Sequence, residues 1–174
     1  MSESTNNTLN KLRTGVIDVA LITTPHHSHE DVEYIKVTKF KNVIVAGNEF
    51  KELKDRVVNI SELHNYPFIA MNQKTQLREY TDSFFLTHSI PINPTVQVDN
   101  AGLIIPFVRN NLGVAIVPYS LAKGSIERGE MFVVETKEEI PDRYVLMVVS
   151  KALPLSNATK TFVKEVKEKI KREH

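Results

Sequence analysis

A helix end, a glycine, a short apolar run and a proline follow one another twice along the chain. The first copy covers residues 12–25 and the second covers residues 108–118. Apolar residues three and four apart before the first glycine predict a helix, and the nearly continuous apolar run at 17–22 predicts a strand buried on both faces, as in a parallel sheet. Open α/β sheets bind ligands beyond the carboxyl ends of their strands, so polar residues after each run are candidate ligand contacts.

The rest of the chain alternates between the helical and the strand period of apolar residues. Further helices are predicted at 76–88, up to about 111, at 119–127 and after 156. Strands are predicted at 34–40, 42–47, 67–71, 95–98, 114–117, 131–134 and 144–149. Pro106 lacks an amide donor and lies inside one of these helices, so that helix is expected to kink or to start late.

This order of elements predicts a mixed α/β fold with two lobes. Lobe two is expected at residues 61–139, and lobe one is expected to be discontinuous, formed by residues 1–60 and 140–174. Two strands would then cross between the lobes, near 57–67 and 133–143. Two-strand connections of this kind suit hinge closure around a ligand.

Composition narrows the possible classes of function. Of the 174 residues 25% are charged, and the formal net charge is only +1, so charge gives no indication of nucleic-acid binding by this chain. There is no cysteine, which excludes disulfides and thiolate metal ligands. No apolar run approaches the ~18 residues that span a bilayer, and the polar N-terminus does not resemble a signal peptide. We therefore expect a cytoplasmic location and no membrane partner.

Motifs for catalysis or metal binding are not found. The sequence contains no G-x-S-x-G, H-E-x-x-H, P-loop or G-x-G-x-x-G pattern, so no enzyme and no cofactor are predicted. His26, His27 and His29 are possible metal ligands, but no helix or strand fixes their spacing, so a solvated loop without metal is favoured. Lysines of the last helix alternate with glutamates, which is typical of a solvated face rather than of a DNA site.

Four segments together resemble the effector-binding domain of LysR-type transcriptional regulators. They are LRTGVIDVALI at 12–22, ISELHNYPFI at 60–69, VRNNLGVAIVP at 108–118, and residues 155–166 in the closing helix. Each motif alone is weak, but their order and spacing are fairly specific. The resemblance covers roughly residues 3–169.

The resemblance implies a two-lobed fold like that of type 2 periplasmic binding proteins, with a small effector, expected to be an anionic metabolite, in the cleft between the lobes. It also implies DNA binding through a winged helix-turn-helix domain that this chain does not contain, and assembly into homodimers or homotetramers. The first strand and helix of lobe one are expected to be absent, because residues 3–5 align with the end of the family's second strand.

The candidate effector contacts follow strand ends. Thr23 falls on an effector-contact position of the family, and Thr24 follows it. The alternative to ligand contact is that both threonines only stabilise the turn before Pro25. A helix N-terminus is a natural anion site, and one is predicted just after residue 72, where simple capping by Thr75 is the alternative. The full set of predicted effector-binding residues is Thr23, Thr24, Asn72, Gln73, Thr75, Gln76, Asn100 and Pro118.

Two other functions fit the same fold. The first is a solute-binding protein of a transport system, which would need a leader sequence, whereas a regulator would carry a helix-turn-helix domain. The second is an enzyme such as a prephenate-dehydratase-like or deaminase-like lyase, for which no acid–base or nucleophile set is visible.

Overall fold

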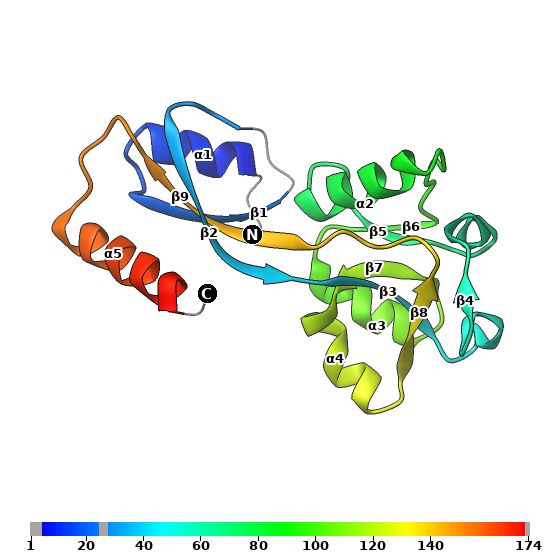
Figure 1. Cartoon of the computed structure of the whole chain (residues 1–174). Coiled ribbons are helices and arrows are strands. Elements are labelled where there is room, and N and C mark those ends of the chain that lie inside the picture. Colours follow the sequence, from blue (N-terminus) through cyan, green and yellow to red (C-terminus); the bar gives the residue numbers. More distant parts are fainter. Residues whose placement is uncertain (1–4, 25–27, 173–174) are drawn as a thin grey trace. The chain divides into compact units, whose positions relative to one another are not determined.

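The computed structural model describes residues 5–24 and 28–172, and the chain divides into two compact units. Unit 1 comprises Met1–Phe40 and Arg143–His174, and unit 2 comprises Lys41–Asp142. Figure 1 shows the elements of each unit.

Unit 1 is an antiparallel sheet with a helix on each face. In its described part the elements are α1 (Thr5–Arg13), β1 (Val19–Thr23), β2 (Val32–Phe40), β9 (Arg143–Ser150) and α5 (Asn157–Arg172). The strand order is β1-β9-β2. Leu12 of α1 packs with Leu146 and Val148 of β9, whereas Val163 of α5 packs with Met147. Successive strand residues point to opposite faces, so both faces of β9 are buried.

The strand β1 differs from its prediction as a strand of a parallel sheet. It pairs antiparallel with β9 and lies at the end of the strand order. Ala20 and Ile22 are buried, but Leu21 points to the other face and is 63% exposed. A continuous apolar run therefore does not reveal the direction of the neighbouring strand, which comes from a segment more than a hundred residues away.

Asp18, which interrupts the apolar run before β1, anchors the first turn of α5. Its carboxylate accepts a hydrogen bond from the hydroxyl of Thr159 at 2.8 Å. Ser156 caps the same turn by accepting from the Thr159 amide at 3.2 Å. The Thr159 hydroxyl, followed by contacts with Ser156, lowers the pKa of Asp18 below its ordinary value. The carboxylate also suits the positive end of the helix dipole.

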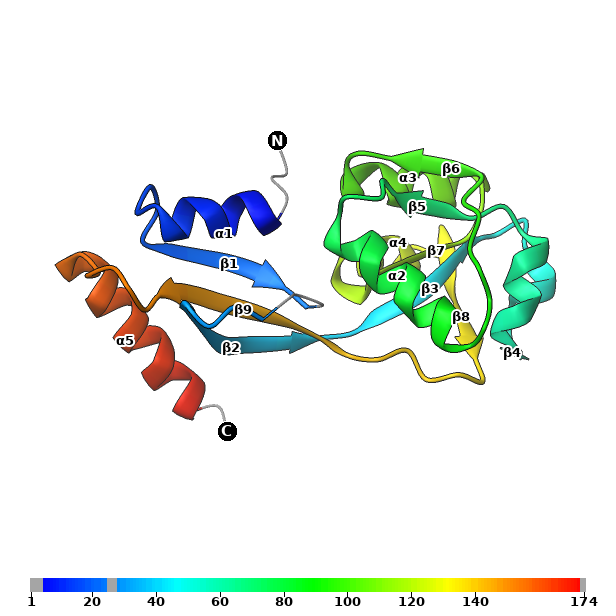
Figure 2. The same ribbon diagram turned by 90° about the horizontal axis from the view of Figure 1, so that it is seen from above.

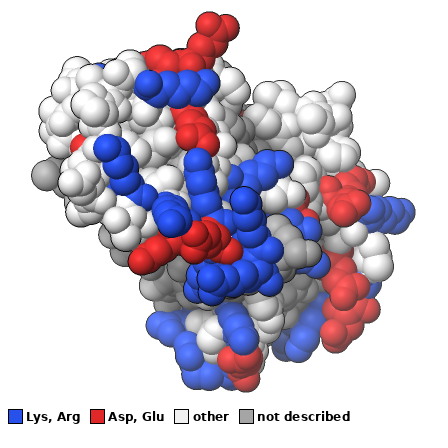
Figure 3. All heavy atoms as spheres, turned by 60° about the vertical axis from the view of Figure 1, so that its left-hand side comes forward, with Lys and Arg blue, Asp and Glu red and all other residues white. Residues whose placement is uncertain are grey.

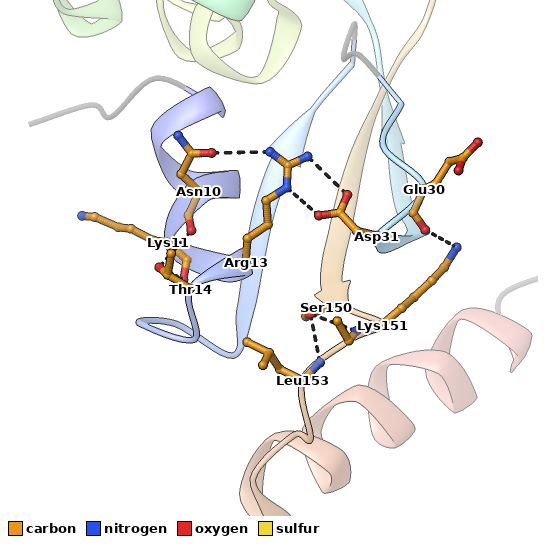
Figure 4. A network of polar contacts seen from close by, with 10 residues as sticks. Asn10, Lys11, Arg13, Thr14, Glu30, Asp31, Ser150, Lys151 and Leu153 are labelled. Carbon is orange, nitrogen blue, oxygen red and sulfur yellow. Dashed lines mark hydrogen bonds and ion pairs between the residues drawn. The ribbon is translucent and has the colours of Figure 1, made fainter.

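A second polar network joins three distant segments of unit 1 (Figure 4). Arg13 at the end of α1 donates to both carboxylate oxygens of Asp31, at 2.6 and 3.2 Å. Lys151 donates its backbone amide to the Asp31 carbonyl at 3.0 Å and its ammonium to the Glu30 carbonyl at 3.0 Å. The guanidinium of Arg13 lowers the pKa of Asp31. The end of α1, the start of β2 and the end of β9 are thereby fixed together.

The exposed side of α5 carries both signs of charge. The ammonium of Lys167 donates to the carboxylate of Glu33 in β2 at 2.8 Å. The ammonium nitrogen of Lys164 lies 3.9 Å from a carboxylate oxygen of Glu168. Figure 3 shows basic and acidic side chains close together on the corresponding face of the molecule. This arrangement agrees with the mixed-charge helix face expected from the sequence.

Unit 2 has a mixed sheet with helices on both faces. In its described part the elements are β3 (Asn42–Gly47), η1 (Lys51–Leu53), β4 (Val57–Val58), η2 (Ile60–Asn65), β5 (Ile69–Met71), α2 (Gln76–Thr87), β6 (Val96–Val98), η3 (Ala101–Leu103), α3 (Ile104–Arg109), β7 (Ala115–Pro118), α4 (Tyr119–Glu127) and β8 (Met131–Thr136). The main sheet has the order β4-β8-β3-β7, and β5 and β6 form a parallel pair. Ile44 of β3 packs in a cluster with Phe84 of α2, whereas Val45 packs with Val108 of α3 and Ala122 of α4.

The division of the chain differs from the predicted lobe boundaries at 60/61 and 139/140. The structure divides between residues 40 and 41 and between 142 and 143. The reason is that β3 pairs with both β7 and β8, and β4 pairs with β8. Residues 41–60 therefore belong to the second sheet. Such long-range pairing leaves no signal in the local pattern of apolar residues.

The turn between α3 and β7 shows how the second copy of the motif is built. The left-handed residue after the helix is Asn111, with φ of +61°, rather than the glycine. Gly113 instead allows a close approach, because a Cβ there would lie 2.4 Å from the carbonyl oxygen of Pro67. That carbonyl accepts from the Val114 amide at 2.8 Å. Pro106 is the third residue of α3, where its missing donor costs nothing, so the expected late start is confirmed.

Replacing Gly113 should destabilise the chain through this contact. We expect Gly113→Ala to lower the free energy of unfolding by about 1–3 kcal/mol, since the backbone must move away from the Pro67 carbonyl. Gly124→Ala is the control, because its Cβ meets only the end of the Arg128 side chain, at 3.3 Å. Within α4 that change should be neutral or stabilising. Urea denaturation measures both, and equal stability of the two variants would contradict the steric role of Gly113.

The Asp18 anchor predicts a pH-dependent stability. Its pKa is lowered in the folded chain, so its contribution is present above the unfolded value of about 3.9 and is lost as pH falls through the lower folded value. Asp18→Asn should therefore melt below the unmodified chain at pH 7, and the gap should close in acid. Glu165→Gln, an exposed change on the same helix, should melt like the unmodified chain. A gap independent of pH would refute the carboxylate's role.

Candidate functional site

The polar residues of unit 2 gather at one edge of its sheet. β5 and β6 are parallel, and the bridge between Phe68 and Val114 gives β7 the same direction. β3 is antiparallel to β7, so that Asn42 at its start lies opposite Pro118 at the end of β7. The carboxyl ends of β5, β6 and β7 and the start of β3 therefore share an edge. Figure 2 shows β5 and β6 side by side, with α2 following β5.

The junction between β5 and α2 is a capped helix N-terminus, as predicted. The Thr75 hydroxyl accepts from the Arg78 amide at 3.3 Å and donates to the Asn72 carbonyl at 3.0 Å. The first turn of a helix has amide donors without partners in the helix and a positive dipole end, so it attracts anions. Gln76 is half-buried in this turn, and Gln73 is exposed just before it.

The junction after β6 is tied to the one after β5. The Asn72 side chain donates to the carboxylate of Asp99, and its backbone amide donates to the Val98 carbonyl at 3.0 Å. Asn100 caps the following 3-10 turn by accepting from the Gly102 amide at 2.8 Å. Asn72 and Asn100 thus hold the two loops in place, and the carboxylate of Asp99 is hydrogen-bonded to the side chain of Asn72.

Arg78 is a charged residue of this edge that sequence reasoning missed. It is 5% exposed, lies in the first turns of α2, and donates to the Met71 carbonyl at the end of β5 at 3.2 Å. Its guanidinium also donates to Asp82 at 2.7 Å. The only sequence signal was the i, i+4 spacing of Arg78 and Asp82 on a predicted helix. A buried cation beside the helix N-terminus strengthens its attraction for an anion.

Asn42 is a second residue that sequence reasoning missed. It is 4% exposed, and neither its side-chain nitrogen nor its side-chain oxygen has a hydrogen-bond partner within the described residues. Leaving a buried polar group unpaired costs about 1–3 kcal/mol. Asn42 is the first residue of a strand whose other residues are mainly apolar. Its burial depends on pairing with strands that lie far along the chain, so the local sequence did not predict it. Pro118, opposite it, is half-buried and contributes its backbone to the strand end.

The predicted contacts Thr23 and Thr24 lie at the end of β1 in unit 1. The Thr23 hydroxyl accepts from the guanidinium of Arg143 at 2.7 Å, and the Thr24 hydroxyl accepts from the Tyr144 amide at 3.0 Å. Arg143 is 3% exposed and lies over the ring of Phe40 at 5.3 Å. The Thr23 hydroxyl and the backbone carbonyl of Thr24, which also accepts from the Arg143 guanidinium, thus hold a buried arginine at the start of β9. Their contact with an effector stays a prediction.

Elsewhere in the described part of the chain we find no comparable grouping of polar residues. His26 and His27, considered above as metal ligands, lie outside the described residues, and within the described ranges no three His, Cys, Asp or Glu side chains cluster as metal ligands would. A hollow of about 380 Å³ beside α5 is lined mainly by lysines, of which Lys164 pairs with Glu168 and Lys167 pairs with Glu33. Among the helices of residues 5–24 and 28–172, none combines the length and the apolar character needed to cross a bilayer.

Comparison of the chain with known proteins finds a matching family. The sequence profile of a family described as the LysR substrate binding domain matches residues 1–171. The effector-binding domain of QuiR, solved in complex with shikimate, is 20% identical with a TM-score of 0.83, over 98% of this chain and 79% of that one. The regulatory domain of CcmR from Synechocystis PCC6803, in complex with 2-PG, is 16% identical with a TM-score of 0.79, over 92% and 76%.

A third solved structure has the same fold. It is the regulatory domain of HypT from Salmonella typhimurium in its apo-form, 13% identical with a TM-score of 0.80, over 99% of this chain and 81% of that one. No curated protein sequence matches the chain. The similar structures confirm the predicted mixed α/β fold of a LysR regulatory domain.

Proposed function

The chain belongs to the LysR substrate-binding domain family, the effector-binding regulatory domain of LysR-type transcriptional regulators, and we propose that it binds a small anionic metabolite at the edge of unit 2 where α2 begins. This family is not one of enzymes, and the match favours a sensor over a transport protein. The regulator acts on DNA, so we infer a cytoplasmic location and DNA contact through another domain.

The observation that carries the proposal is the capped N-terminus of α2 with a buried arginine beside it. Thr75 orients the first turn, and Arg78 adds a positive charge that its ion pair with Asp82 partly balances. An anion at this place would meet both the amide donors and the dipole of α2. The relatives bound to shikimate and to 2-PG support a small-molecule effector of this chemistry.

Binding regulates only if the effector has different affinities for two states of the regulator. We propose that the effector shifts the packing of subunits in a homodimer or homotetramer and so changes how their DNA-binding domains meet the operator. We also propose that units 1 and 2 are the two lobes of a periplasmic-binding-protein-like fold. Within residues 5–24 and 28–172, β1 has one partner strand, and its Leu21 is exposed. This supports a further strand and helix completing lobe one in the whole regulator.

A charge substitution tests the anion site without unfolding it. We expect Gln76→Glu to weaken binding of an acidic effector at least about tenfold, because it places a negative charge at the site. An acidic side chain in the first turn also stabilises the helix α2 through the helix dipole. The melting temperature should therefore be kept. Calorimetry and thermal shift with acetate, lactate, malate, shikimate and phosphate measure binding and stability.

The matched control is Ser83→Glu, which adds the same charge at an exposed position of α2 about two turns further on. It should bind the same acids as the unmodified chain does. The proposal is wrong if none of the acids binds the unmodified chain, or if Gln76→Glu and Ser83→Glu bind them equally well.

A further inference from the structure

The unpaired side chain of Asn42 is the feature of unit 2 that the fold does not explain. Its strand neighbours are satisfied: the backbone carbonyl of Lys41 accepts from the Tyr119 amide at 2.9 Å, and β3 pairs with β7 from Asn42 to Val45. Asn42 as a whole is 4% exposed, and neither the nitrogen nor the oxygen of its carboxamide has a partner within the described residues. Buried polar groups of native proteins are almost always paired, so a missing partner is expected there.

The strand register places this carboxamide on the α2 side of the sheet. Side chains along β3 alternate, and Ile44 and Ala46 pack in the cluster that contains Phe84 and Phe85 of α2. Asn42 is two residues before Ile44, so it points to the same side. Because α2 starts at the edge where β3 also starts, Asn42 and the N-terminus of α2 lie on one side of one edge.

A carboxamide selects its partner by offering both a donor and an acceptor. An ionised carboxylate or phosphate only accepts, so it would pair with the side-chain nitrogen of Asn42 and leave the oxygen unpaired. A hydroxyl group both donates and accepts, so it can satisfy both atoms. The acid-binding features of the site are already supplied by the first turn of α2 and by Arg78.

We propose that Asn42 binds a hydroxyl group of the effector, and that the effector is therefore a hydroxy acid rather than a simple acid. The proposal rests on the effector site proposed above and adds its chemical class. The acidic group lies at the start of α2, and the neighbouring hydroxyl donates to the oxygen of Asn42 and accepts from its nitrogen. An acid without that hydroxyl leaves Asn42 unpaired and binds more weakly.

The test compares pairs of acids that differ by one hydroxyl group. Lactate against propionate and malate against succinate are titrated calorimetrically into the unmodified chain and into Asn42→Leu, a change of similar volume. We expect the unmodified chain to prefer a hydroxy acid by about tenfold or more. Asn42→Leu should lose that preference while keeping its affinity for the acid without the hydroxyl, because only the polar pairing is removed.

Stability without ligand separates this role from a structural one. Replacing an unpaired buried amide by an apolar group removes its desolvation cost, so Asn42→Leu should melt at the same temperature or higher. A lowered melting temperature would show that Asn42 already has a partner in the free chain, such as a buried water, and would overturn the proposal. Asn48→Leu, just after the other end of β3, is the control: Asn48 donates to the Gly129 carbonyl at 2.7 Å, and its loss should leave the hydroxyl preference unchanged.

The outcomes also separate this proposal from the one it rests on. If no acid binds, or Gln76→Glu has no effect, the anion site itself fails. If acids bind and Gln76→Glu weakens them, but the hydroxyl preference is absent or survives in Asn42→Leu, the role of Asn42 fails alone.

Discussion

The backbone hydrogen bond from Val114 to Pro67 is a contact on which the proposed effector-binding edge of unit 2 depends. It joins the β5–β6 pair to β7, and it is short because Gly113 leaves no Cβ in the way. At the same junction the Ile69 amide donates to the Val114 carbonyl at 2.9 Å. These two bonds hold β5 beside β7 and so place the N-terminus of α2 at the edge where β3 starts. A single glycine thus helps to position the proposed site, to which it contributes no side chain.

The same edge combines features that cost stability. Arg78 is a buried cation, Asn42 is a buried amide without a partner among the described residues, and Asp99 places a negative charge near a helix that should attract anions. Asn72 pairs with Asp99 and so reduces the last of these costs. Unfavourable groups that persist in an otherwise well-packed unit are expected where a ligand completes the hydrogen bonding. Binding of the ligand then offsets the free energy that burying these groups costs on folding.

Local signals in the sequence predicted the local structure of this edge. Apolar periodicity located α2 and β5, and Thr75 was recognised as the cap, because capping depends on residues three apart. The direction of β1, the boundary between the two units near residue 40 and the burial of Asn42 were not predictable in this way. Each depends on pairing with β9, β7 or β8, and the sequence records no strand register. Arg78 was missed because its spacing with Asp82 equally fits an exposed ion pair.

The two copies of the sequence motif show why a matched pattern does not assign roles to residues. In the first copy Gly15 has φ of +71° and ends α1, and Asp18 anchors α5. In the second copy Asn111 takes the left-handed position, and Gly113 serves the close approach to Pro67. One pattern therefore meets two different steric demands. The family resemblance identifies the fold through this pattern, whereas the effector chemistry that we propose rests on residues outside it, such as Asn42 and Arg78.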